Sequence, residues 1–218
     1  MRCSHLNRAL CTLRDMKIMD DQKNRENWRK FYEKALNRPH SIRTERAVHL
    51  DKSATKIAID CGCGTGSDIE YLNSRNYEVF GFDINPDSIA ICRDRFGGKL
   101  RVHVTQSSFG DFQYIDVSLI IANASLFFVA PSQFKSVWSK IDASLVKGGV
   151  FAGDFMGKND SWADDFHTPL TTLTKNELLD LFSNFEIIEL TERDEDGQTM
   201  LGDSKHWHIY SVVAVKRT

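Results

Sequence analysis

The sequence lacks any uninterrupted apolar stretch approaching the roughly 20 residues that a membrane-spanning helix requires, and it begins without the continuous apolar core of a secretory signal. It also lacks a run of lysine or arginine, because 28 basic and 30 acidic residues are spread along the chain for a formal charge of −2. Binding along a nucleic-acid backbone depends on clustered cations, so this pattern disfavours nucleic acid as a partner. These absences predict a soluble, cytoplasmic protein with no membrane or nucleic-acid partner.

Cysteine is scarce and shows no disulfide framework. The five cysteines are odd in number and irregularly spaced: Cys3, Cys11, Cys61, Cys63 and Cys92. Such usage is typical of a reducing compartment in which thiols stay free. The C-x-C pair at 61 and 63 has no companion pair, whereas a structural zinc ion needs four ligands. His206 and His208 share a strand face, but no further ligand stands at a suitable spacing. We therefore predict no metal site.

Strand-like and helix-like segments alternate regularly along most of the chain. From 56 to 157, short apolar runs that end in turn residues alternate with amphipathic segments. This order is typical of βαβ units and predicts an α/β fold: a doubly wound, mostly parallel sheet of seven strands with helices on both faces. Two further strands, 185–192 and 206–216, are separated by the turn-rich segment 193–204 and by no helix. We expect these two to form an antiparallel C-terminal hairpin.

Two helices precede this region and are predicted to form an N-terminal helical cap. Apolar side chains recur at helical spacing over 20–50, where Pro39 ends the first helix and Ser41 begins the second. We therefore divide the chain into an N-terminal tail with cap helices, residues 1–50, and a Rossmann-like domain, residues 51–218.

Residues 60–68, DCGCGTGSD, follow the first predicted strand. In an open parallel sheet the first strand-to-helix turn is the usual seat of a ligand, and glycines let the backbone approach that ligand closely. The third glycine comes one position too early for a dinucleotide fingerprint. Asp60 and Asp68 bracket the loop with negative charge that repels phosphate, so the loop suits a ligand with positive charge.

Asp83 ends the second predicted strand, at about the 20-residue spacing from the glycines that is expected of an acid that binds ribose hydroxyls. A ribose-bearing ligand with cationic groups and no phosphate describes S-adenosylmethionine. Two other interpretations stay open: an NAD-dependent oxidoreductase, which needs room for a pyrophosphate, and a protein that binds S-adenosylmethionine without turnover.

The chain resembles the class I S-adenosylmethionine-dependent methyltransferases through three motifs: AIDCGCGTGSD at 58–68, GFDIN at 81–85 and SLVKGGVF at 144–151. The resemblance spans about residues 50–218, with a more local likeness to the tellurite-resistance-type small-molecule methyltransferases. It implies transfer of the methyl group of S-adenosylmethionine to a small-molecule acceptor by in-line displacement. We expect a monomer or a homodimer.

The resemblance also implies which residues contact the cofactor. In chain order these are Tyr32, Arg43, Asp60, Gly62, Cys63, Gly64, Asp83, Ile84, Ser107, Ser108 and Asn123. Asp60 and the backbone of 62–64 would face the methionine end of the cofactor. Asp83 would hold the ribose hydroxyls, and Ile84 would lie against the adenine.

The remaining cofactor contacts follow the family pattern less closely. Ser107 and Ser108 stand where the family usually places an acid for the adenine amino group, which leaves that contact open. Asn123 would approach the amino-acid end of the cofactor. Tyr32 or Arg43, from the cap helices, would reach its carboxylate.

Two residues are candidate catalytic groups. Asp154 ends the fifth predicted strand, and His167 lies in the polar stretch 156–172, which is longer than the roughly 2–6 residues of an ordinary connection. Either residue could take a proton from a hydroxyl or amine acceptor, whereas a soft anion needs no base. Asp154 could equally cap a turn or a helix.

Overall fold

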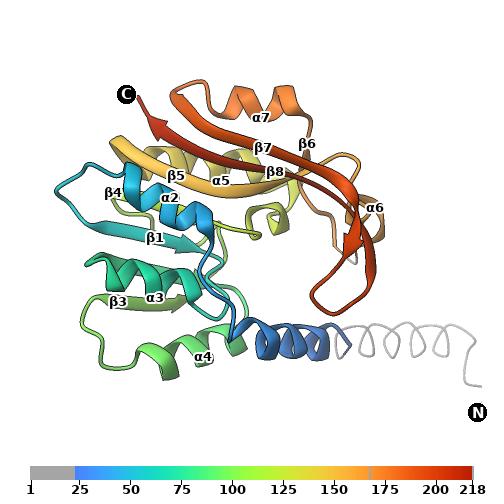
Figure 1. The fold of residues 1–218 in the computed structure, drawn as a ribbon, viewed down its shortest axis with the longest axis horizontal. Helices are drawn as coiled ribbons and strands as arrows, with labels where there is room; N and C mark the ends of the chain where they lie inside the picture. Colours follow the sequence, from blue (N-terminus) through green and yellow to red (C-terminus); the bar gives the residue numbers. More distant parts are fainter. Residues whose placement is uncertain (1–22, 167, 218) are drawn as a thin grey trace, which may run out of the picture.

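The computed structural model describes residues 23–166 and 168–217, which form one sheet with helices on both of its faces (Figure 1). The strands follow the order β3-β2-β1-β4-β5-β8-β7, and the short β6 pairs with β5 outside that path. Their bounds are β1 (Ile57–Cys61), β2 (Glu78–Asp83), β3 (Val102–Gln106), β4 (Val117–Ala122), β5 (Leu145–Gly157), β6 (Thr172–Leu173), β7 (Phe185–Gln198) and β8 (Ser204–Lys216).

The sheet is parallel from β3 to β5 and antiparallel at β8 and β7, which confirms the predicted α/β class and the C-terminal hairpin. It has one strand more than the seven predicted, because the two residues of β6 pair with the end of β5. The strand order reverses between β1 and β4. Ligands of open α/β sheets bind at the carboxyl ends of the strands beside such a switch point. The loops after β1 and β4 are therefore the expected seat of a ligand.

The helices start where the sequence supplies capping groups. Their bounds are α2 (Ile42–Leu50), α3 (Ser67–Ser74), α4 (Pro86–Phe96), the 3₁₀ turn η1 (Leu126–Phe128), α5 (Pro131–Ser144), α6 (Trp162–Asp165) and α7 (Lys175–Leu181). Residues 23–35 are also helical. The Ser41 side chain accepts the backbone N–H of Arg43, which caps α2 at the predicted residue. None of the helices in the described ranges is long and apolar enough to cross a membrane.

Two large hydrophobic clusters cover the two faces of the sheet. One cluster joins α2, α3 and α4 to the sheet through residues such as Ala47, Ile69 and Ile89. The other joins α5 and α7 to the opposite face through Trp138 and Leu178. Because both clusters reach β4, every residue of that strand is buried. The central strands thus give the loops that follow them a rigid base.

The C-terminal hairpin is longer than the sequence pattern predicts. The segment 193–204 reads as a turn, but β7 continues through it to Gln198 and β8 begins at Ser204. Charged and polar residues occupy most of this extension, so no apolar periodicity marks it as a strand. In Figure 1 the hairpin extends past the body of the sheet toward α6.

The N-terminal helical segment packs directly on the loop after β1. The Thr65 hydroxyl donates to the carbonyl oxygen of Ala35 at 3.3 Å. The Ser67 hydroxyl donates to the carbonyl oxygen of Arg38 at 2.9 Å. The helix at 23–35 is thereby held over the carboxyl end of the sheet, where a cap was predicted.

Candidate functional site

The glycine loop, residues 60–68, turns so tightly that two of its positions exclude a side chain. Gly62 has a φ of 71°, and a Cβ there would lie 2.5 Å from the Cβ of Ser125. Gly66 has a φ of 82°, and a Cβ there would lie 2.5 Å from the ring of Phe96. Glycine alone tolerates both the left-handed backbone and the contact. The loop after β1 is therefore packed against the loop after β4 on one side and against α4 on the other.

Asp60 is a buried acidic residue of the glycine loop. It is 3% exposed, and its Oδ2 has no hydrogen-bond partner among the described residues. Burial first, and the neighbouring Asp68 carboxylate second, raise the pKa of Asp60 well above its usual range. A buried carboxyl oxygen without a donor costs free energy. An ammonium group brought by a ligand would supply both the missing donor and the opposite charge.

Asp83, at the end of β2, lies next to the same loop. The backbone N–H of Gly64 donates to its Oδ2 at 3.0 Å, and that of Asn85 donates to its Oδ1 at 2.9 Å. Burial raises the pKa of Asp83, although these hydrogen bonds oppose the shift. The adjacent Ile84 side chain is 69% exposed, so its apolar surface is open to a flat ring. The Asp83 carboxylate can accept ribose hydroxyls and the Ile84 side chain can cover a base, which are the roles predicted for these two residues.

Arg43 of α2 and Asp154 of β5 form an ion pair, with Nη2 and Oδ2 2.6 Å apart. Asp154 is 4% exposed and also accepts the backbone N–H of Ala124 at 2.9 Å and the Ser211 hydroxyl at 2.5 Å. Arg43 Nε donates to Asn123 Oδ1 at 3.3 Å. Because both carboxylate oxygens of Asp154 are hydrogen-bonded, the geometry favours a role in positioning Arg43 over the predicted role as a base.

Asn123 connects the loop after β4 to the other predicted site residues. Its Nδ2 donates to Asp68 Oδ2 and to Thr44 Oγ1, each at 3.0 Å. Asp68 Oδ1 accepts the backbone N–H of Ser41 at 2.9 Å. The structure thus brings α2, the glycine loop and the loop after β4 together at the switch point of the sheet.

The predicted adenine contacts after β3 are bound to one another. The backbone N–H of Ser107 donates to the carbonyl oxygen of Asp83 at 3.0 Å, which places this turn beside Asp83, the acid predicted to bind the ribose. The Ser108 hydroxyl donates to Asp111 Oδ2 at 2.6 Å. Asp111 is an acid that the sequence reasoning missed, and its place three residues beyond Ser108 was the available signal. An acid is thus present near the position where the serines seemed to replace one.

Tyr32 and three cysteines fill the space around the loop. Tyr32 is buried, and burial, followed by the charge of Asp83, raises the pKa of its hydroxyl. Cys61, Cys63 and Cys92 are buried free thiols. A hydrogen bond with Cys92 and burial raise the pKa of the Cys63 thiol. A thiol that stays protonated is a poor nucleophile and metal ligand, so the Cys63 side chain serves packing.

The stretch 156–172 contains α6 and is tied to the C-terminal hairpin. Asp160 forms a fully buried ion pair with Lys205, and its Oδ2 accepts the backbone N–H of His208 at 3.0 Å. These contacts hold the segment before α6 beside the end of β5 and the start of β8. His167, the second predicted catalytic residue, lies outside the described residues.

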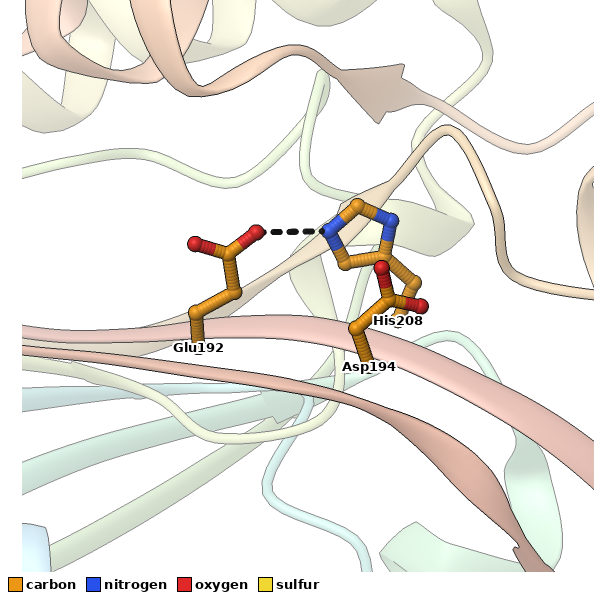
Figure 2. A group of neighbouring side chains, drawn as sticks. All are labelled: Glu192, Asp194 and His208. Carbon is orange, nitrogen blue, oxygen red and sulfur yellow. Dashed lines mark hydrogen bonds and ion pairs between the residues drawn. The ribbon is translucent and has the colours of Figure 1, made fainter.

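Glu192 and Asp194 of β7 and His208 of β8 bring possible ligand atoms within 4.8 Å of one another (Figure 2). The backbone N–H of Asn159 donates to His208 Nδ1 at 3.0 Å, so Nε2 carries the proton and donates to Glu192 Oε1 at 3.2 Å. A metal at Nε2 would require the opposite tautomer, whose Nδ1–H would face the N–H of Asn159. The hydrogen bonds therefore define a polar network and leave no ring nitrogen free for a metal.

Comparison with known proteins identifies the region around the glycine loop. Residues 58–149 match the family described as "Methyltransferase domain". The carboxy-S-adenosyl-L-methionine synthase of Colwellia psychrerythraea (strain 34H) is 25% identical over 126 residues, which are 56% of this chain and 52% of that protein. The chain thus spans about half the length of this curated relative.

Solved structures share the fold. TehB from Haemophilus influenzae has a TM-score of 0.66 at 19% identity, covering 82% of this chain and 62% of that chain. The 1,6-didemethyltoxoflavin-N1-methyltransferase of Burkholderia thailandensis, solved with 1,6-didemethyltoxoflavin and S-adenosylhomocysteine, has a TM-score of 0.63 at 18% identity and covers 100% of this chain and 93% of that chain. At these identities the likeness establishes the fold. Residues 58–149 therefore match a methyltransferase domain, and the chain has the fold of the class I S-adenosylmethionine-dependent methyltransferases, as its motifs predict.

Proposed function

We propose that this protein binds S-adenosylmethionine and transfers its methyl group to a small-molecule acceptor. The observation that carries the proposal is Asp60, a buried carboxylate with one oxygen that no described residue satisfies, in a glycine loop at the switch point. A donor with ammonium and sulfonium groups matches this negative charge, whereas a pyrophosphate would be repelled by it. The matched methyltransferase domain contains this loop and supports the same ligand.

The residues around Asp60 fit the rest of the donor. Asp83 would accept the ribose hydroxyls, and Ile84 would lie against the adenine. Asp111, with the neighbouring serines, would accept the adenine amino group, since its carboxylate lies beside Ser108. Arg43, held by Asp154, would bind the donor carboxylate.

When bound, the donor supplies a methyl group on a positively charged sulfur. The task of the protein is then to align the acceptor nucleophile with the methyl carbon and the sulfur and to exclude water. The helix at 23–35 and the 156–172 stretch, at the carboxyl ends of the strands, would enclose that space. Asp154 acts through Arg43, and any proton on the acceptor passes to water or to a group outside the described residues.

The small-molecule acceptor is supported by the solved relatives. The Burkholderia enzyme acts on 1,6-didemethyltoxoflavin, and NodS from Bradyrhizobium japonicum WM9 is named as an N-methyltransferase. We further propose that residues 1–50 act as an N-terminal tail and cap and that 51–218 form the catalytic domain, a division that falls between α2 and β1.

Calorimetry with S-adenosylmethionine and S-adenosylhomocysteine tests the proposal. We expect both to bind, Asp60→Asn to weaken both, and Asp116→Asn, an exposed acid before β4, to change neither. Absence of binding by the wild-type protein would overturn the proposed function.

A fluorescence titration with NADH tests the oxidoreductase alternative. Donor binding without release of S-adenosylhomocysteine across a broad acceptor panel would favour a binding protein without turnover.

A further inference from the structure

A third hydrophobic cluster lies apart from the two that cover the sheet. Its buried residues are Phe127, Met156 and Leu170. Phe127 belongs to η1, directly after β4, and Met156 lies near the end of β5. The cluster therefore sits at the carboxyl ends of β4 and β5, the edge of the sheet at which ligands of such folds bind.

A row of half-buried aromatic rings covers this cluster. The ring centroids of Trp28 and Phe128 are 5.7 Å apart, those of Phe128 and Phe166 5.6 Å, and those of Phe166 and Trp162 5.2 Å. All three pairs are tilted or edge-to-face, the geometry that aromatic quadrupoles favour. The four rings come from three segments far apart in the sequence, the helix at 23–35, η1 and the α6 region. We call these four residues the aromatic row.

The aromatic row is continuous with the donor site. Trp28 stacks on Tyr32 with ring centroids 5.8 Å apart and an interplanar angle of 29°. Both residues belong to the helix at 23–35, whose last carbonyl oxygen, that of Ala35, accepts the hydroxyl of Thr65 in the glycine loop at 3.3 Å. The row therefore starts on the helix that packs against the glycine loop and runs from there over the ends of β4 and β5.

Charge in this region is neutralised within the protein. Lys205 lies with its Nζ 4.4 Å from the ring centroids of both Trp162 and Trp207, and it is ion-paired with the buried Asp160. Arg43 is paired with Asp154 and is assigned above to the carboxylate of the donor. Neither cation is offered to an anionic acceptor, so the region favours an apolar partner over an oxyanion.

We propose that the acceptor is an uncharged planar aromatic or heteroaromatic compound that binds against the aromatic row. The inference rests on the proposed function and names its acceptor class. A nucleophilic atom attached to the ring gives its electron pair to the methyl carbon while the carbon–sulfur bond breaks. The sulfur keeps that bonding pair and becomes a neutral thioether, and the proton of the acceptor hydroxyl, amine or thiol passes to water.

Equilibrium binding to the protein loaded with S-adenosylhomocysteine tests the acceptor class. 2-Naphthol and decahydro-2-naphthol share a carbon skeleton and a hydroxyl group and differ in aromaticity. By calorimetry we expect 2-naphthol to bind about tenfold more tightly, which is the effect of one or two aromatic contacts. Equal affinities, tighter binding of the saturated alcohol, no binding of 2-naphthol, or competition by tellurite would overturn the inference.

Variants test the role of the aromatic row itself. Phe128→Leu keeps an apolar side chain and removes a ring, so we expect it to abolish the preference for 2-naphthol and to leave the affinity for S-adenosylhomocysteine unchanged. The matched control is Phe80→Leu, which removes a ring stacked on His103 at the other edge of the sheet. An equal loss of preference in both variants would contradict the assignment. Failure of the wild-type protein to bind S-adenosylhomocysteine would instead overturn the proposed function.

Discussion

The burial of Asp60 without a hydrogen-bond donor for Oδ2 among the described residues has two consequences. It favours a cationic ligand, and it lowers the stability of the free protein. Its Oδ2 lacks a donor, and burial favours the protonated form. The folded-state pKa lies above the unfolded value, so the folded state binds more protons, and the free energy of unfolding falls as the pH rises through that interval. At neutral pH the carboxylate therefore destabilises the free protein.

Asp60→Asn should raise stability and lower donor affinity. We expect the Tm at pH 8 to rise by about 2–4 °C, the effect of 1 kcal/mol in a chain of this size. The gain should shrink toward pH 4, where the wild-type side chain is protonated. Affinity for S-adenosylhomocysteine should fall by about tenfold to a hundredfold, since a charged hydrogen bond is lost. Scanning calorimetry at several pH values measures the Tm, and titration calorimetry measures the affinity. An unchanged affinity together with a lower Tm at pH 8 would contradict the role given to Asp60.

Asp154→Asn separates a positioning residue from a base. The variant keeps the shape of Asp154 and loses the charge that holds Arg43, so donor affinity should fall, and stability by about 1–3 kcal/mol. With an active acceptor, the pH profile of kcat should keep its shape. If Asp154 were the base, kcat would instead fall by orders of magnitude and the acidic limb of the profile would disappear.

At the scale of single elements, α7 shows how local sequence stabilises a short helix. The Thr174 side chain accepts the backbone N–H of Glu177, and the Glu177 carboxylate accepts the backbone N–H of Thr174. Thr174→Ala should lower the free energy of unfolding by about 1 kcal/mol. Urea denaturation measures this against Ser139→Ala, an exposed site within α5. Donor affinity should be equal in both variants, and a similar stability loss in both would show that the cap contributes nothing.

In the outer part of the C-terminal hairpin, His206 bridges two aspartates of the facing strand. His206 bonds to Asp194 through Nε2 at 2.8 Å and to Asp196 through Nδ1 at 2.7 Å. These hydrogen bonds raise the pKa of His206 above its usual 6.5. The contribution to stability is thus complete below the unfolded pKa and is lost as the pH rises through the folded pKa.

His206→Gln should therefore destabilise the protein more at pH 5.5 than at pH 9. Two-dimensional NMR of the wild-type imidazole should show a pKa above 6.5, and Asp196→Asn should lower it. A pKa at or below 6.5, or a stability difference independent of pH, would contradict the bonding described for the hairpin.

At the scale of the whole molecule, ligand binding should stabilise the folded chain. At a concentration of S-adenosylhomocysteine about 100 times its Kd, the free energy of unfolding rises by about 2.7 kcal/mol. For a chain of this size we expect a Tm increase of about 5–10 °C. The increase should disappear in Asp83→Asn if that acid holds the ribose. Equal increases in the variant and the wild-type protein at matched concentrations would contradict this role.

Much of the fold could be predicted from the sequence because burial on both faces of a parallel sheet leaves apolar runs such as that of β4. That Asp83 lies beside the glycine loop could be predicted because the carboxyl ends of neighbouring parallel strands meet at one edge of the sheet, whereas the ligand roles of both stay predictions. The ion pair between Arg43 and Asp154 could not be predicted, because it joins residues 111 positions apart and no local pattern encodes it. The outer hairpin was missed because its strands are polar on both faces.

One hydrogen bond ties the donor site to the order in which the chain is made. Ser211 of β8 donates a hydrogen bond to Asp154, which in turn holds Arg43 of α2. A ribosome-bound chain that has not yet released β8 lacks the Ser211 hydrogen bond to Asp154 and so cannot complete the support of Arg43. The full anchor of Arg43, and with it tight donor binding, should therefore require synthesis through β8, and chains that stop before Ser211 should bind the donor more weakly.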